Sequence, residues 1–192
     1  MHPQLAAIAA EFETALRRLR QLAQDTPGSW WTKRADPARW SIGECVAHLN
    51  LTSRTYLPLM RQALDEGRAL PRSSGHPSRY RRDFVGWMLW RTQGPPVRFG
   101  KVRTTAQFIP SAEAPRQETL AEFERLQAEQ VECVREAEGL PLGKLWMRSP
   151  FDPRARYNLY SCLTILPRHQ HRHLWQAEQV LRGLRGGGAS SS

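Results

Sequence analysis

Apolar side chains recur at intervals of three and four residues along most of this chain, and this helical period restricts the fold more than any other feature of the sequence. In residues 5–22, for example, Leu5, Ile8 and Phe12 begin a stripe that continues to Leu22. Stripes of the same period occupy three further segments, 41–66, 116–138 and 157–184. No segment alternates apolar and polar residues as a strand would, so the sequence predicts an all-α fold in which four long helices form a bundle.

Two of these helices carry a proline in their interior. The second helix is expected to begin at Ser41, because Ser41 and Glu44 have the spacing of a capping box, in which each side chain bonds the backbone of the other residue. Proline removes a helical hydrogen bond. We therefore expect Pro58 to bend or divide the second helix and Pro167 to bend the last one.

The second and third helices are joined by a long crossover that contains many prolines. We expect residues 67–115 to be irregular overall, with a short helix over 82–91 and an extended or irregular path over 97–110. A chain of 192 residues, 40% of them hydrophobic, supplies one core, which predicts a single domain over 1–185. The remaining residues, 186–192, are glycine, alanine and serine and predict a flexible tail.

Composition disfavours several classes of protein. No run approaches the roughly 18 apolar residues of a membrane-spanning helix, and the N-terminus has acidic residues where a signal peptide has an apolar run. We therefore expect a cytoplasmic protein without a membrane partner. Cys45, Cys133 and Cys162 form no CxxC motif and are expected to be reduced thiols. The sequence has no P-loop, glycine-rich dinucleotide motif or Ser/His/Asp order, which leaves nucleotide chemistry without support.

Positive charge is concentrated in the crossover. The chain has 28 Lys and Arg against 18 Asp and Glu, and residues 61–110 hold ten of the basic residues and three of the acidic ones. Within this stretch Arg79, Arg81 and Arg82 form a candidate site for binding a carboxylate or phosphate. A run of charges is more often only a solvated surface, so the charge pattern leaves both interpretations open.

Three of the six histidines crowd into the last helix, in the segment RHQHRH. At 100° per residue, His169 and His173 lie about 40° apart on one face, which is expected to face the bundle. His171 points about 200° away from His169 and is expected to face out. His48 lies on the interior side of the second helix together with Cys45. The three inward histidines are therefore candidate ligands of one metal ion.

The chemistry of such a site is that of an open metal centre. Three neutral imidazoles leave a divalent ion with its full charge and at least one open position, which is typical of a catalytic site. Imidazole suits zinc, nickel, copper and iron alike. Glu44 and Gln176, each about one helical turn from a candidate ligand, are candidates to orient the ligands or a bound water. Cys45 is either a thiol at the site or only a small apolar residue. Histidines at helical spacing are often ordinary surface residues, so spacing alone leaves the metal site open.

Three short motifs resemble those of the DinB-like (YfiT-type) superfamily: WSIGECVAHL around His48, Phe-Ile-Pro at residues 108–110, and HQHRHLWQ at residues 169–176. The resemblance extends over most of the chain, from the first helix to the last. It implies a four-helix bundle, often a homodimer, in which His48, His169 and His173 bind a divalent metal ion such as zinc or nickel. Helical geometry selects the same three histidines.

The resemblance leaves the reaction open. Some members resemble transferases or isomerases that activate a low-molecular-weight thiol on the metal, and others are described as metal-dependent hydrolases. We expect a thiol transferase in preference to a hydrolase, because a metal-bound thiolate is a strong nucleophile and the carboxylates of such thiols suit the Arg-rich crossover. The alternative is a non-enzymatic module that binds an anionic partner through Arg79, Arg81 and Arg82, with nucleic acid disfavoured as that partner.

Overall fold

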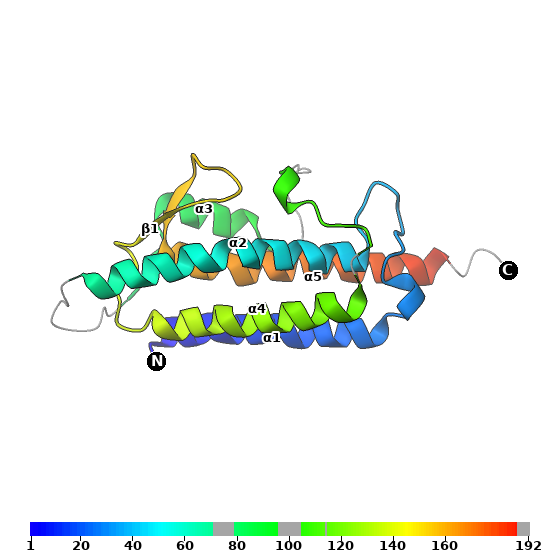
Figure 1. Cartoon of the computed structure of the whole chain (residues 1–192), viewed down its shortest axis with the longest axis horizontal. Helices are drawn as coiled ribbons and strands as arrows, with labels where there is room; N and C mark the ends of the chain where they lie inside the picture. Colours follow the sequence, from blue (N-terminus) through cyan, green and yellow to red (C-terminus); the bar gives the residue numbers. More distant parts are fainter. Residues whose placement is uncertain (71–78, 96–104, 114, 188–192) are drawn as a thin grey trace.

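The computed structural model describes residues 1–70, 79–95, 105–113 and 115–187. In this part of the chain four long helices build the body of the molecule (Figure 1): α1 (Pro3–Asp25), α2 (Ile42–Ala69), α4 (Arg116–Glu136) and α5 (Leu159–Gly187). The predicted all-α bundle is confirmed. α5 continues through the first two residues of the expected tail, and residues 188–192 lie outside those described.

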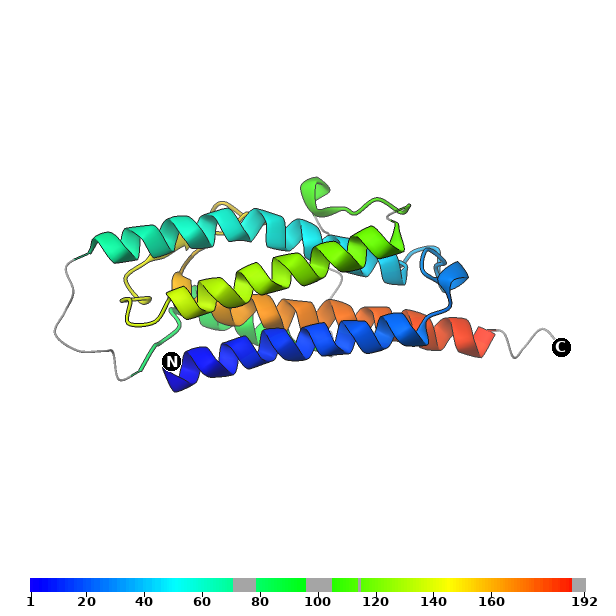
Figure 2. The ribbon, with the colours of Figure 1, turned by 60° about the horizontal axis from the view of Figure 1, so that its bottom comes forward.

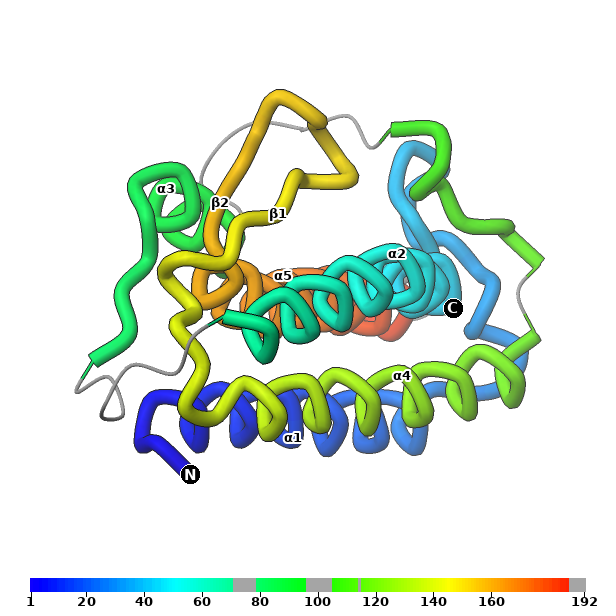
Figure 3. The backbone as a smooth tube through the Cα atoms, turned by 60° about the vertical axis from the view of Figure 1, so that its left-hand side comes forward, coloured from blue at the N-terminus to red at the C-terminus, as the bar shows by residue number. Residues whose placement is uncertain are grey.

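The four helices form two layers (Figures 1 and 3). α2 and α5 lie side by side in one layer and α1 and α4 in the other, while α2 contacts α4 and α1 contacts α5 across the layers. Figure 2 brings α1 and α4 to the front. α1 and α5 run in one direction and α2 and α4 in the opposite one, as the colours in Figure 1 show. Because α2 and α4 are parallel, the chain between them must return along the bundle, which explains the long crossover.

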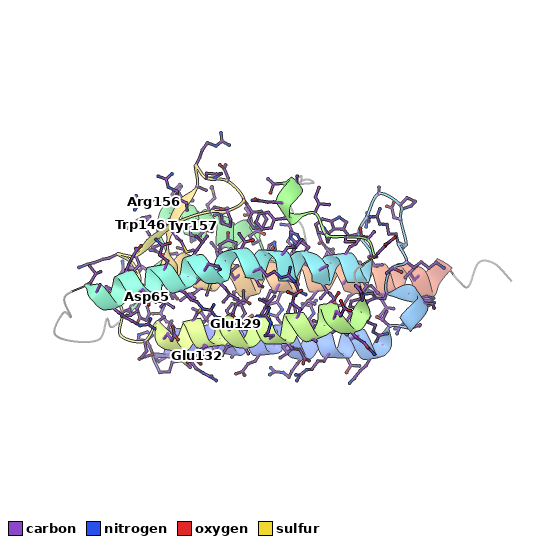
Figure 4. All side chains as sticks on the ribbon, viewed as in Figure 1. Asp65, Glu129, Glu132, Trp146, Arg156 and Tyr157 are labelled. Atoms are coloured by element: carbon purple, nitrogen blue, oxygen red, sulfur yellow. The ribbon has the colours of Figure 1, made fainter. Side chains whose placement is uncertain are left out.

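The core between the layers is apolar with a small polar network. Its fully buried side chains include Phe12, Leu19, Leu49, Met60, Leu64 and Phe123. Between α4 and α5, the amide nitrogen of Gln170 donates to the side-chain oxygens of Gln127 (2.8 Å) and Gln130 (2.9 Å). On the surface, Arg61 of α2 forms an ion pair (2.6 Å) with Glu129 of α4; Figure 4 labels Glu129. No helix within the described residues is long and apolar enough to cross a membrane.

α2 begins as expected and is not divided by its proline. It follows a 3₁₀ turn, η1 (Gly28–Trp30), in the connection from α1. The Ser41 hydroxyl accepts the N–H of Glu44 (3.1 Å) and the Glu44 carboxylate accepts the N–H of Ser41 (2.8 Å), which completes the capping box. Pro58 lies within one continuous helix. Pro58 and Arg54, whose carbonyl loses its helical partner, are both exposed, so water can bond that carbonyl and the helix continues.

The crossover is regular in two places. α3 (Phe84–Thr92) confirms the short helix expected over 82–91. A 3₁₀ turn, η2 (Ala106–Phe108), interrupts the path expected to be irregular over 97–110, and residues 96–104 of that path lie outside those described. Both α3 and η2 lie on the outer side of the α2/α5 layer, opposite α1 and α4 (Figure 3).

A short two-stranded sheet follows α4 in the chain, in a segment where the sequence shows no strand pattern. β1 (Trp146–Arg148) and β2 (Arg156–Asn158) pair in antiparallel register. Tyr157 is buried, whereas the guanidinium of Arg156 lies 5.4 Å from the ring centroid of Trp146 on the outer side (Figure 4). Three residues are too few to show the two-residue period of a strand, and pairing with another segment stabilises both strands.

Two side chains hold the starts of α3 and α5 together. Asn158 caps α5, because its Oδ1 accepts the N–H of Ser161 (2.8 Å). Asp83 caps α3 through one oxygen, which accepts the N–H of Gly86 (3.0 Å). Its other oxygen accepts the N–H of Asn158 (2.9 Å) and the hydroxyl of Ser161 (2.7 Å). A Cβ at Gly86 would lie 2.0 Å from Ser161 Oγ, so only glycine permits this close approach of α3 to α5.

We predict that Gly86→Ala destabilises this junction. Its methyl group would lie 2.0 Å from Oγ and 2.2 Å from Cβ of Ser161. Overpacking of this kind costs about 1–3 kcal/mol, and the better helix propensity of alanine offsets at most about 1 kcal/mol. The expected net loss is about 1–2 kcal/mol in the free energy of unfolding, measured by urea denaturation. Gly28→Ala is the matched control, because nothing lies within 4 Å of the position of its Cβ, and equal losses in both variants would contradict the prediction.

Candidate metal centre

Three histidine side chains from two helices meet where α2 lies beside α5. His48 lies in the second turn of α2, and His169 and His173 lie one turn apart on α5. One ring nitrogen of each lies within 4.8 Å of the others. The ring centroids are 4.5 Å apart for His48–His173 and His169–His173, and 5.3 Å apart for His48–His169. All three side chains are buried. The structure therefore brings together the three residues that the sequence selects.

Hydrogen bonding distinguishes the ring nitrogens. The Nε2 atoms of His169 and His173 face each other at 3.1 Å. Nδ1 of His48 lies 2.8 Å from the carbonyl oxygen of Phe108, an acceptor, so Nδ1 carries the proton of the neutral ring and Nε2 keeps a lone pair. The Nδ1 atoms of His169 and His173 are buried and have no hydrogen-bond partner within the described part of the chain.

Aromatic side chains from the connecting segments cover the cluster. The Trp40 ring, just before α2, lies 4.8 Å from the His48 ring, measured between centroids. Phe151, in the β1–β2 connection, lies 6.4 Å from His48 and 6.0 Å from His169, and it stacks on Phe108 of η2 at 3.9 Å. The cluster thus faces the connecting segments on the outer side of the α2/α5 layer, and not the centre of the bundle as the sequence predicted.

The covering positions of Trp40, Phe108 and Phe151 are not predicted from the sequence. Trp40 and Phe108 stand in two of the motifs that carry the family resemblance, so their place in those motifs was a signal that could have found them. Phe151 has no comparable signal, because only the path of the hairpin brings it to His48, which lies more than a hundred residues earlier in the chain.

Burial keeps the three imidazoles neutral. Desolvation is the largest cause that lowers their pKa from the ordinary value of 6.5, and the pKa values of His169 and His173 lie well below it. The charge of Arg172 and the neighbouring rings lower the pKa of His169 and His173 further. Only the hydrogen bond to Phe108 raises the pKa of His48. Near neutral pH the rings are therefore uncharged, which is the form in which histidine binds a metal ion.

Glu44 is engaged by other residues. Its carboxylate accepts hydrogen bonds from the guanidinium of Arg34 and from the N–H of Ser41. Desolvation raises the pKa of Glu44, but the bonds from Arg34 and Ser41 together outweigh it and lower that pKa. Glu44 is therefore an ionised carboxylate that holds the start of α2, and an additional role in orienting a bound water stays a prediction.

The remaining predicted neighbours differ in their relation to the cluster. The side chain of Gln176 raises the pKa of His173, whereas burial lowers it. Cys45 is buried, and desolvation raises the pKa of its thiol to about 12, so it behaves as a small apolar residue. His171 does not face out: its Nε2 lies 2.9 Å from a carboxylate oxygen of Glu11, because α1 covers that side of α5.

The three arginines predicted to bind an anion line a cavity that is separate from the histidine cluster. Arg79, Arg81 and Arg82 line a cavity of about 340 Å³, and its other lining residues are Gln4, Tyr80, Trp87 and Tyr160. Nε of Arg82 donates to the hydroxyl of Thr164 (2.8 Å). None of the three clustered histidines lines this cavity, so the structure separates the arginines from the histidine cluster.

The donor set of the cluster suits a divalent ion that prefers nitrogen ligands. Within the described residues the group consists of three imidazoles, with no carboxylate or thiolate among them. Neutral nitrogens crowded in a dry site lose their water hydrogen bonds, and the two orphaned Nδ1 atoms show that the protein does not replace all of them. Zinc and nickel both fit such ligands, as do copper and iron.

One comparison with known proteins gave a match. The family model of the DinB superfamily matches residues 11–177, a range that covers most of the chain and contains all three histidines. Searches among curated proteins and among solved structures returned no match.

We predict that acid destabilises the metal-free protein through His169 and His173. Unfolding returns their pKa values to about 6.5, so below this pH the unfolded chain binds more protons than the folded one. The free energy of unfolding should fall as the pH drops from 6.5 to 5.5, by up to about 1.4 kcal/mol per histidine and pH unit. Urea denaturation with a chelator present measures this slope. The double variant His169→Gln/His173→Gln should show a shallower slope, and an unchanged slope would contradict the prediction.

Proposed function

The chain belongs to the DinB superfamily, and from this membership we propose that it is an enzyme that depends on a divalent metal ion, zinc or nickel, held by His48, His169 and His173. The observation that supports this proposal most is the burial of three neutral imidazoles whose ligand atoms lie within 4.8 Å of one another. Ordinary surface histidines are exposed to solvent and isolated from one another, whereas these three are buried together between residues of two helices.

A divalent ion held by neutral nitrogens keeps its positive charge and lowers the pKa of a water or thiol that binds it. The protein's own groups prepare the site for that chemistry. The carbonyl of Phe108 holds the proton of His48 on Nδ1 and so directs Nε2 toward the other two rings. The rings of Trp40, Phe108 and Phe151 exclude water from the cluster, which strengthens electrostatic interactions there.

We further propose that the substrate is a low-molecular-weight thiol and that the reaction is S-transfer. No carboxylate belongs to the cluster within the described residues, and the carboxylate of Glu44, one helical turn before His48, is engaged by Arg34 and Ser41, which disfavours it as the general base of a hydrolase. Cys45 cannot supply the sulfur, because its thiol is buried and protonated. In the transfer, the substrate sulfur bonds to an electrophilic carbon, the leaving group departs with its electron pair, and the thiol proton passes to solvent.

We predict that the wild-type protein binds about one metal ion per chain and that His48→Ala and His173→Ala each lose most of it. Each substitution removes one of three ligands. Elemental analysis of protein purified without an affinity tag measures the metal content. His171→Ala is the matched control, because it removes an imidazole from the opposite side of the same helix, and it should retain the metal. Equal metal content in all variants would refute the three-histidine site.

We predict that metal-loaded protein conjugates glutathione, bacillithiol or mycothiol to 1-chloro-2,4-dinitrobenzene. The conjugation rate should fall at least tenfold in His48→Ala and stay unchanged in His171→Ala. Absorbance of the thioether product measures the rate. Metal-dependent cleavage of an ester without any thiol would instead favour the hydrolase within the same site.

The cavity lined by Arg79, Arg81 and Arg82 supports a second candidate, a non-enzymatic module for an anionic partner. Binding by such a module would weaken steeply with salt and would not respond to a chelator. Binding that requires the metal would favour the enzyme. A cytoplasmic location and a homodimer stay predictions.

A further inference from the structure

Two Arg-His pairs stand one helical turn apart on α5. Arg168 precedes His169, and Arg172 precedes His173. Neighbouring residues of a helix differ by about 100° in direction, so the arginines form a second face beside the histidine face. The histidine face meets α2, and the arginine face meets α3, which also lies against α5.

Trp90 of α3 contacts the arginine face of α5. The guanidinium carbons of Arg82 and Arg168 each lie 4.2 Å from the ring centroid of Trp90. Arg172 donates from Nη1 to the carbonyl oxygen of Thr92 (3.3 Å). All three arginines are half-buried. Contact with an aromatic ring orients a guanidinium but leaves the N–H donors at its edge available.

The three positive charges have no acidic partner. Within the described residues none of Arg82, Arg168 and Arg172 forms an ion pair, and the segments 71–78 and 96–104 contain no acidic residue. Asp83, next to Arg82 in the chain, is engaged by the starts of α3 and α5. Nε of Arg168 is buried and has no hydrogen-bond partner in the described part.

This arrangement is unfavourable unless an anion joins it. Burial lowers the pKa of Arg82, and the charge of Arg168 lowers it further. Like charges one helical turn apart, as in Arg168 and Arg172, repel each other. A carboxylate or phosphate would neutralise the cluster and accept hydrogen bonds from the free donors, because oxyanions match the planar fork of arginine.

We propose that Arg82, Arg168 and Arg172 form an oxyanion-binding subsite that holds a carboxylate or phosphate group of the small-molecule substrate beside the histidine cluster. Arg168 and Arg172 each directly precede a clustered histidine in the chain, which places the arginines and the imidazoles on adjacent faces of α5. That the bound group belongs to the substrate rests on the proposed function, whereas the subsite itself does not require the metal. It differs in its two α5 arginines from the anion-binding site predicted at Arg79, Arg81 and Arg82, which line a separate cavity.

The test is a titration of the full-length, metal-free protein labelled with ¹⁵N, followed through the arginine Nε–Hε signals by NMR. Glutarate and inorganic phosphate are the two probes, added at constant ionic strength. We expect a saturable shift of the Arg168 signal, which Arg168→Gln identifies by its disappearance. Tighter binding of glutarate would identify the ligand group as a carboxylate, and tighter binding of phosphate would identify it as a phosphate. Arg168→Gln and Arg172→Gln should each weaken binding at least tenfold, because each removes a charged donor.

Two further variants distinguish a specific oxyanion site from non-specific attraction of anions to positive charge. Gly94→Ala removes no charge, but its Cβ would lie 2.4–2.7 Å from the guanidinium atoms of Arg168 and must displace them, so it should also weaken binding. Arg182→Gln removes an exposed charge from the same helix and should leave binding unchanged. Circular dichroism confirms that each variant is folded.

Three outcomes would overturn the subsite: shifts that do not saturate, equal weakening in Arg182→Gln, or weakening only in Arg79→Gln and Arg81→Gln, which alter the neighbouring cavity. Metal content measured on the same samples separates this inference from the proposed function. Saturable oxyanion binding in a protein that takes up no metal would support the subsite and refute the metal-dependent enzyme. Metal uptake without oxyanion binding would refute the subsite and leave the metal-dependent enzyme supported.

Discussion

Packing of α2 against α5 is the contact on which the rest of the molecule depends. These two helices bring His48 to His169 and His173, and all three rings are buried. Desolvation is the largest cause of their lowered pKa values, so burial itself selects the neutral form that a metal ion requires. Keeping three polar rings buried costs free energy, which the apolar core between the two layers offsets.

The connecting segments complete the site that the helices begin. The crossover supplies the carbonyl of Phe108, which fixes the tautomer of His48, and the hairpin supplies Phe151 as a cover. Asp83 and Asn158 join the starts of α3 and α5, so the crossover is attached to the helix that carries two of the histidines. An antiparallel pair α2–α4 would need only a short turn. Their parallel arrangement instead requires a long return, and this return carries the residues that surround the cluster.

α5 combines two kinds of chemistry on adjacent faces. Its histidines offer neutral lone pairs to a cation, whereas Arg168 and Arg172 offer charged donors to an anion. Helical geometry places the two groups on adjacent faces of one helix. The positive charge of Arg172 also disfavours protonation of His169 and His173, so the arginine face helps keep the rings in their neutral form.

The sequence by itself determined the four long helices, the capping box at Ser41 and the choice of His169 and His173, because helical periodicity and caps are local properties of the chain. It could not place His171 against α1, reveal strands of three residues, or bring Phe151 to His48, because each depends on contacts between segments far apart in the sequence. The same holds for Arg168, whose stacking on Trp90 exists only once α3 lies against α5. Tertiary structure decided these features because burial and the absence of a counter-charge are properties of packed surfaces and not of residue spacing.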